Sequence, residues 1–496
     1  MLHEQDLSTN VKSFKNIVLR ENLYYNNSIK AFRRRNMADK NDITKKLGTA
    51  PVPRLLISLA IPSVIAQIVN LLYNIVDRIY IGHMDSSDST ALTGVGLCFP
   101  IICLIGAFTM LIAQGGAPRA AIFMGKGDNR SAQKILGNCF SAVILMSVVL
   151  TAVFLIFSEK LLWMFGASED TIGYALDYAR IYTVGSIFVM ISMGLNLFIS
   201  TQGFTLFSMG TVLIGAGLNI ILDPIFIFVL GMGVKGAAIA TVISQGVSAV
   251  WTILFLTGKK TKLKLSLPDM KPDVRLLLPC LGLGLAPFVM QSTEAVINVA
   301  FNSSLQNYGG DIAVGTMTVA ATIMQVIWMP AQGIGMGAQP IISFNYGAGN
   351  PDRCIKAIKT MLLLTGVYFL SLWLTVQLFP KALMEIFTDD ALLLGNYNLI
   401  RIYVGATGFF FFQTTAQQGL VSVGKAKASL FIACLRKLIL LVPLIYILPR
   451  FFENKVFAVF LAEPVSDTIS IITASVIFIF VFGGEMKKLR KEKGIS

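Results

Sequence analysis

Polar side chains recur at intervals of three and four residues along an apolar stretch near the start of the sequence. They are Ser63, Gln67, Asn70, Asn74 and Asp77. This spacing places all five on one face of a helix. A second apolar stretch repeats the pattern with Gln291, Glu294, Asn298 and Asn302. Gln67, Asn70, Asn74, Gln291, Glu294 and Asn298 could bind an organic cation, or the amides could simply join neighbouring helices by hydrogen bonds.

Two further apolar stretches carry oxygen ligands that match Asp77. Asn219 and Asp223 are one helical turn apart, and Thr241 follows in the next stretch. If these stretches cross a membrane in alternating directions, Asp77, Asp223 and Thr241 lie at a similar depth. Such oxygen atoms suit a small cation, and two neighbouring carboxyl groups can equally share a proton. An ionised residue in hydrocarbon costs on the order of 3 kcal/mol, which favours a functional role for these acids.

Charged residues also occur in the last two apolar stretches. Glu463 and Asp467 are one turn apart, and Arg436 and Lys437 stand in the stretch before them. An acid inside a membrane usually has a partner. We therefore predict that Arg436 pairs with Glu463 or Asp467 within the membrane. The alternative is that Arg436 and Lys437 extend their side chains to the membrane surface.

The helices that must position these residues follow from the composition. Hydrophobic residues make up 55% of the 496 residues and charged residues 14%, whereas soluble domains carry about 25% charged residues. Apolar runs long enough to cross about 30 Å of hydrocarbon recur along the chain. The sequence thus predicts an all-α polytopic membrane protein with twelve transmembrane helices. The predicted spans are 55–83, 91–113, 135–157, 174–199, 204–230, 234–257, 275–304, 311–342, 355–379, 395–421, 428–448 and 456–482.

Charge in the connections predicts the orientation. Basic residues are concentrated in alternate connections and in the C-terminal tail, while the opposite connections are short and often acidic. The positive-inside rule then places both termini in the cytoplasm. The predicted parts are a disordered tail (1–53), an N-lobe of helices 1–6 (54–257), a cytoplasmic linker (258–274), a C-lobe of helices 7–12 (275–482) and a basic tail (483–496).

The two lobes resemble each other in sequence. Gly125 and Pro118 correspond to Gly347 and Pro340, each 222 residues further on. Because six spans separate the halves, the repeat is parallel, with an axis along the membrane normal. Two six-helix lobes facing each other form an architecture for alternating access.

Several function classes are excluded by absent patterns. The sequence has no Walker A motif, so ATP-driven transport is not expected. The sequence shows no cluster of a nucleophile and a base, so an enzyme is not expected. The six cysteines are scattered and only two histidines occur, so we expect no cofactor, no disulfide and no metal site beyond a small-cation site at Asp77, Asn219, Asp223 and Thr241. The basic residues lie between apolar spans, which argues against nucleic acid as a partner.

The combined motifs resemble the multidrug and toxic compound extrusion (MATE) family. IPSVIAQIVNLLYNIVDRIYIGHM, with Pro62 and Asp77, looks like the first helix of that family, and GLNIILDP (217–224) and GVKGAAIAT (233–241) resemble its fifth and sixth helices. The similarity runs from about Met37 to the C-terminus. AEPVSD, which contains Glu463 and Asp467, is more weakly similar to the MepA-like branch.

The resemblance implies a function and a set of site residues. The implied activity is export of organic cations in exchange for Na⁺ or H⁺, with Asp77, Asn219, Asp223 and Thr241 as the cation-coupling site and Pro62 at a helix bend. Glu294 matches an acid of the NorM-like branch, but span 10 lacks the aspartate of that branch. The rival interpretation is a flippase for lipid-linked oligosaccharides. Membrane lipid is the remaining partner, and a monomer is expected.

Overall fold

The computed structural model describes residues 46–82, 90–388 and 390–494. In these ranges the regular elements are all helical, and ten helices are long and apolar enough to cross a membrane. The predicted all-α polytopic membrane fold is confirmed.

The N-terminal bundle accounts for the first six predicted spans. Thr90 to Gly125 serves as one span although α3 and α4 are separate elements, and a π-helical turn, η1, extends α7. The elements are α2 (Val52–Gly82), α3 (Thr90–Gly96), α4 (Phe99–Gly125), α5 (Asn129–Met164), α6 (Glu169–Thr201), α7 (Thr205–Pro224), η1 (Ile225–Val229) and α8 (Gly233–Thr257).

The C-terminal bundle is less regular. The tenth predicted span is divided among α13, η3 and α14, and a π-helical segment, η4, interrupts the eleventh. The elements are η2 (Leu267–Met270), α9 (Val274–Gly347), α10 (Pro351–Leu378), α11 (Pro380–Glu385), α12 (Ala391–Leu394), α13 (Tyr397–Tyr403), η3 (Thr407–Phe409), α14 (Phe411–Ser422), α15 (Ala426–Cys434), η4 (Leu435–Leu441), α16 (Val442–Ile447), η5 (Leu448–Arg450) and α17 (Lys455–Glu492).

The helix α9 contains two spans. Its 74 residues would measure about 110 Å as one straight helix, far more than the bilayer core. Gly310 divides it, because its backbone angles (φ 62°, ψ −158°) are not helical. The division falls between the predicted spans 275–304 and 311–342. Two spans in α9 and a broken tenth span therefore reconcile ten long helices with twelve predicted crossings.

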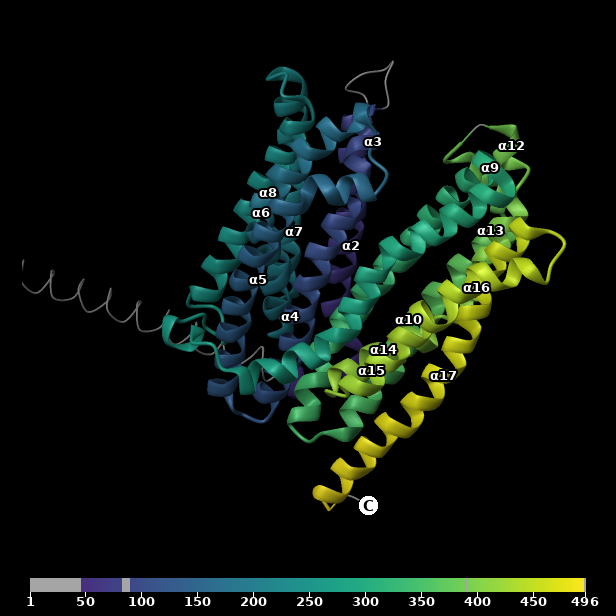
Figure 1. The fold of residues 1–496 in the computed structure, drawn as a ribbon. Helices are drawn as coiled ribbons and strands as arrows, with labels where there is room; N and C mark the ends of the chain where they lie inside the picture. Colours follow the sequence, from purple (N-terminus) through teal and green to yellow (C-terminus); the bar gives the residue numbers. More distant parts are fainter. Residues whose placement is uncertain (1–45, 83–89, 389, 495–496) are drawn as a thin grey trace, which may run out of the picture.

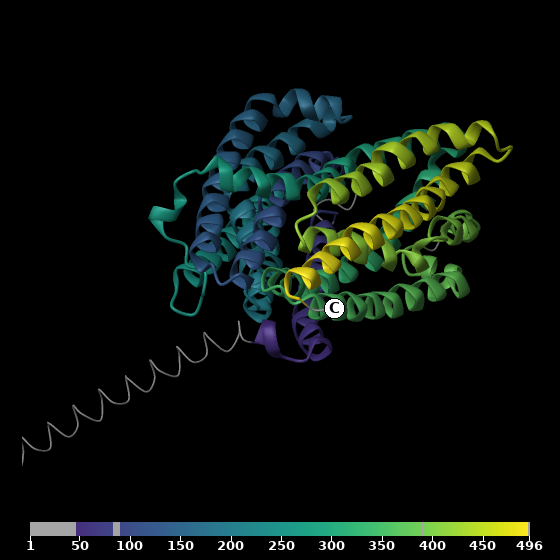
Figure 2. The ribbon, with the colours of Figure 1, turned by 90° about the horizontal axis from the view of Figure 1, so that it is seen from below.

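The two bundles converge at the end where α10 begins and α17 ends, and they diverge toward the other end (Figures 1 and 2). We call the first of these the closed end. There Gly125 of α4 lies against Phe344 of α9, and Gly347 lies against Ile122. A Cβ atom at either glycine would come within 2.0 Å of the opposing carbonyl oxygen. Glycine is thus required at both positions for the backbones to approach this closely.

This contact has the symmetry of the sequence repeat. Gly125 and Ile122 correspond to Gly347 and Phe344 at the same offset of 222 residues. Gly125 contacts Phe344, and its counterpart Gly347 contacts Ile122, which is the counterpart of Phe344. Such an exchange is what a two-fold relation between halves produces. The axis of the parallel repeat therefore passes between α4 and α9.

Two segments at the closed end pack more tightly than the sequence indicates. Leu47, within the tail predicted to be disordered, is 1% exposed. Its carbonyl oxygen accepts hydrogen bonds from Asn345 (2.9 Å) and Arg353 (3.0 Å). Residues 46–53 thus belong to the folded protein, while the rest of the predicted tail lies outside the described residues. Of the basic tail predicted at 483–496, the part up to Glu492 continues the helix α17.

The linker between the bundles is fixed to the N-terminal one. Arg130 of α5 forms an ion pair with Asp269 (3.0 Å). The side-chain oxygen of Gln202 accepts three hydrogen bonds from the linker residues Thr261, Lys262 and Leu263. The linker therefore holds the start of α9 in place beside the N-terminal bundle.

Candidate ion and substrate sites

A polar cluster lies inside the N-terminal bundle, where α2, α7 and α8 meet. Asn219 Nδ2 donates to Asp223 Oδ1 (2.9 Å) and to Thr241 Oγ1 (3.4 Å). Asp77 of α2 lies within hydrogen-bonding and electrostatic range of Asp223. The four residues predicted to form a cation site are thus brought together. We call them the N-lobe cluster.

The N-lobe cluster offers oxygen atoms in a buried setting. Asn219 and Asp223 are 2% and 0% exposed. Because the Asn219 amide points its NH₂ group at Asp223 and Thr241, its Oδ1 atom is left buried without a hydrogen-bond donor among the described residues. A buried acceptor of this kind suits a small cation. No group of three or more His, Cys, Asp or Glu side chains that could hold a metal occurs in the described ranges, so such a site depends on amide and hydroxyl oxygens as well.

Three tyrosines that the sequence analysis did not single out lie near Asp77. Tyr73, Tyr178 and Tyr182 all lie within electrostatic range of its carboxyl group. The rings of Tyr178 and Tyr182 stack at 6.0 Å. Tyr178 and Tyr182 are four residues apart in α6, but this spacing does not reveal that they lie near Asp77 of α2.

The amides predicted to bind substrate lie where the bundles meet or on exposed surface. Gln67 Nε2 contacts the sulfur of Met336 in the other bundle (3.2 Å). Gln291 approaches Gly106 of α4. Asn74 and Asn298 are exposed, and Asn70 is half-buried. A direct contact between the amides of α2 and those of α9 is absent from the hydrogen bonds of the described residues.

The C-terminal bundle holds a network of five charged side chains, which we call the C-lobe network. Arg436 donates from Nε to Asp467 (2.6 Å) and from a terminal nitrogen to Glu463 (2.9 Å). All three side chains are at most 8% exposed. The guanidinium also lies 4.6 Å from the ring centre of Phe410. The pairing expected from the sequence is therefore present, with both acids rather than one.

The fourth and fifth members of the network form a pair that the sequence analysis did not foresee. Lys437 Nζ lies 2.9 Å from Glu294 Oε1, across 143 residues of sequence. Lys437 is 7% exposed and Glu294 is 42% exposed. Lys437 thus lies buried rather than reaching toward a membrane surface. Glu294, which is predicted to bind a substrate cation, is already paired with Lys437 within the protein.

The predicted bend at Pro62 is not visible as a break. The helix α2 continues from Val52 to Gly82 with Pro62 inside it. Proline lacks the N–H that would bond to the preceding turn. Pro62 therefore weakens α2 locally, fifteen residues before Asp77, without ending the helix.

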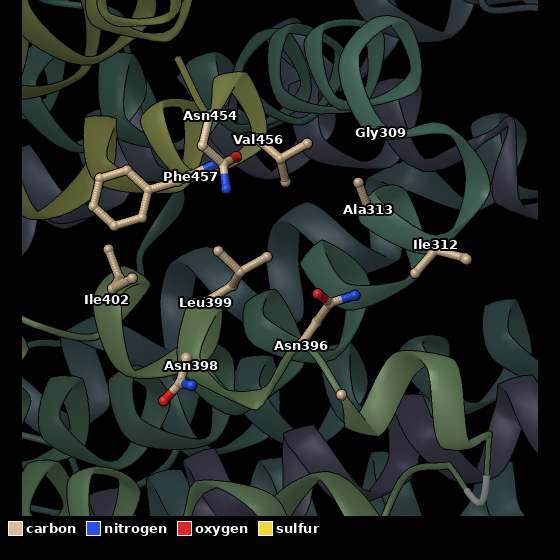
Figure 3. Close-up of a pocket in the computed structure, with 11 residues that line it drawn as sticks. Gly309, Ile312, Ala313, Asn396, Asn398, Leu399, Ile402, Asn454, Val456 and Phe457 are labelled. Atoms are coloured by element: carbon tan, nitrogen blue, oxygen red, sulfur yellow. The ribbon is translucent and has the colours of Figure 1, made fainter. Parts of the chain in front are cut away.

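A separate pocket of about 560 Å³ opens at the end of the C-terminal bundle opposite the closed end (Figure 3). Asn396, Asn398 and Asn454 contribute amides to its wall, beside Leu399 and Phe457. None of the predicted site residues lines it. The cation and substrate predictions therefore do not concern this pocket.

Comparison with known proteins places the chain among membrane transporters. A model of the MatE family matches residues 62–225 and 287–447. Multidrug export protein MepA of Staphylococcus haemolyticus is 25% identical over 331 residues, covering 67% of this chain and 72% of the relative. MepA of Staphylococcus aureus strain N315 is 23% identical over 409 residues, covering 81% and 88%.

Solved structures share the fold. A MATE protein crystallised in a bent conformation superimposes with a TM-score of 0.83 at 23% identity, covering 90% of this chain and 99% of that one. An outward-facing multidrug resistance MATE transporter gives 0.82 with the same identity and coverage. A transporter from Pyrococcus furiosus, described as having a binding pocket of reverse polarity, gives 0.83 at 23% identity and covers 90% and 98%.

Proposed function

The chain belongs to the MatE family, and on this premise we propose that it is a multidrug efflux transporter that exports lipophilic organic cations in exchange for Na⁺ or H⁺. The observation that carries the proposal is the N-lobe cluster, in which two carboxyl groups, an amide and a hydroxyl converge inside a bundle. A buried pair of carboxyl groups binds a cation or a proton in preference to remaining doubly ionised. The relatives described as multidrug export proteins support the transport class.

In this proposal the coupling ion binds inside the N-terminal bundle, and the substrate binds between the two bundles. The coupling ion binds at Asp77, Asn219, Asp223 and Thr241. The substrate binds near Glu294 with the amides Gln67, Asn70, Asn74, Gln291 and Asn298. Pro62 lets α2 bend when the ion enters. Exchange is obligatory because ion and substrate favour different states of the protein.

The rival function, a flippase for lipid-linked oligosaccharides, would favour basic side chains exposed to the substrate. Glu294 is the accessible member of its ion pair, whereas Lys437 is buried behind it. Arg436 is likewise buried between two acids. The surface offered at this point is therefore acidic, which favours a cationic substrate.

Orientation and assembly belong to the same proposal. The basic connections lie at the closed end, where Arg130, Arg353 and Lys493 make their contacts. The positive-inside rule then puts the closed end and both termini in the cytoplasm, and the described conformation faces outward. The protein is proposed to act as a monomer in the bacterial inner membrane.

A cellular assay tests the substrate class. Bacteria that lack their own multidrug pumps and express this chain should accumulate several-fold less ethidium than cells with an empty vector. Glu294→Gln should raise accumulation toward the vector level, while Asp311→Asn, at an exposed residue of the same α9, should not. Equal accumulation with and without the wild-type chain would reject the drug-export proposal and favour the flippase.

A further inference from the structure

The contact between Glu294 and Lys437 is one-sided. The carboxylate is 42% exposed, whereas the ammonium that binds it at 2.9 Å is 7% exposed. A solute can therefore reach Glu294 without passing Lys437. Lys437 binds Glu294 from the interior of the protein, and Glu294 is the acid that a substrate cation would need.

The local fold explains why two consecutive cations point inward. Arg436 and Lys437 lie in η4, the π-helical segment of the eleventh span. A π-helix closes its hydrogen bonds over five residues, so that consecutive side chains diverge less than in an α-helix. Both side chains are buried. Arg436 takes Glu463 and Asp467, and Lys437 takes Glu294.

The C-lobe network is not balanced in charge. Its three carboxylates are Glu294, Glu463 and Asp467, and its two cations are Arg436 and Lys437. If all five groups are ionised, the network carries a net charge of one negative unit. Lys437 also acts electrostatically on Glu463, so a second carboxylate is within range of its ammonium. One additional positive charge would complete the balance.

We propose that Lys437 competes with the substrate for Glu294, and that a substrate carrying one positive charge displaces it toward Glu463 and Asp467. This inference rests on the proposed function and specifies its substrate class. In the absence of substrate, Lys437 neutralises Glu294. When a monocation binds Glu294, Lys437 remains buried and moves toward Glu463 and Asp467. The single positive charge of Arg436 does not neutralise these two carboxylates, so the charge of Lys437 completes the balance there. Lys437 thereby sets the affinity of the site and its preference for a single charge.

The test is equilibrium binding of tetraphenylphosphonium to the purified full-length chain in lipid nanodiscs. Lys437→Met removes the competing ammonium while keeping a chain of similar length. It should tighten binding about tenfold, since close charge pairs in protected sites couple by at least that much. Lys437→Arg keeps a cation and should bind like the wild type. A second neutral variant, Lys437→Gln, carries the same expectation as Lys437→Met.

Two double variants separate competition from a structural role. In a Glu294→Gln background, Lys437→Met should no longer tighten binding, because the contested acid is gone. Glu463→Gln, at a residue 4% exposed, should weaken binding about tenfold with Lys437 present, and should have no effect in the Lys437→Met background. A merely structural role for Glu463 would weaken both backgrounds equally and would overturn the inference.

Failure of the inference differs from failure of the proposed function. If the wild-type chain exports ethidium and folded Lys437→Met and Lys437→Gln bind the cation no more tightly than wild type, the competition is wrong and the exporter stands. If neither the wild type nor any variant binds tetraphenylphosphonium and none exports ethidium, both are wrong.

Discussion

The two bundles treat their buried acids differently. In the N-lobe cluster, Asp223 interacts with the carboxyl group of Asp77 and the amide of Asn219, neither of which is a cation. In the C-lobe network, every acid is paired with Arg436 or Lys437. Among the described residues, Asp223 thus has carboxyl and amide neighbours, whereas the acids of the C-lobe network have cationic ones. The difference teaches that the sequence repeat preserves the helical framework, while the charged side chains inside the two halves have diverged.

The largest expected effect concerns the N-lobe cluster. Asp223→Asn keeps the shape of the side chain but removes one of two carboxyl groups, so coupling should fail and transport should fall to about 1% of wild type or less. Uptake into inverted membrane vesicles measures the rate. Asp177→Asn is the matched control, because Asp177 is 43% exposed and pairs with Lys235 at the surface. Normal transport by the Asp223 variant would remove the distinction between the two bundles.

The next largest effect should be on folding, in the other bundle. Arg436→Ala leaves Glu463 and Asp467 buried without their cation, a loss of about 3–5 kcal/mol for a buried pair. The amount of monodisperse protein after purification should fall sharply. Arg490→Ala, at a 42% exposed side chain paired with Asp352, should change it little. Normal yield and transport for Arg436→Ala would show that the network does not stabilise the bundle.

A smaller effect is expected where the halves are alike. Gly125→Val or Gly347→Val introduces a side chain within 2.0 Å of a carbonyl oxygen, and each should destabilise the closed end by about 1–3 kcal/mol. The midpoint of thermal unfolding measures the loss. Gly282→Val is the control, since no atom lies within 4 Å of its Cβ position. Because the repeat relates the two glycines, unequal losses would contradict the symmetric contact.

The smallest effect concerns the segment before α2. Arg353→Ala removes two hydrogen bonds to the carbonyl groups of Leu47 and Ala50. The expected loss is about 1–3 kcal/mol, at the low end because Arg353 is only half-buried. Proteolysis near residue 46 should become faster than in wild type. Lys356→Ala, at an exposed residue of the same helix α10, should leave the rate unchanged, and an unchanged rate in both would show that the segment is held by other contacts.

What the sequence could predict follows from periodicity and hydropathy. The spacing of Gln67, Asn70 and Asn74 predicts a helix face, and the apolar runs predict the membrane spans. Both features depend only on residues close together in the sequence. The rule that a buried acid needs a partner also led to Arg436. These inferences required no knowledge of how distant helices pack.

The remainder depends on contacts between distant segments. The pair of Lys437 and Glu294 joins two helices 143 residues apart, and neither residue's neighbours indicate the other. The tyrosines near Asp77 are also missed by sequence reasoning, because aromatic residues in a membrane span usually serve as packing. Leu47 stands in a polar segment, but its side chain packs in the hydrophobic core and its carbonyl oxygen accepts hydrogen bonds from Asn345 and Arg353.

The most direct test of the account is ethidium efflux from proteoliposomes, with a Na⁺ gradient and a pH gradient imposed separately on wild type and Asp77→Asn. We expect one gradient to drive efflux by the wild type, and we expect that efflux to be lost in the variant. This result would identify the coupling ion and assign it to the N-lobe cluster. Efflux at the wild-type rate by Asp77→Asn, or no efflux under either gradient, would contradict the account.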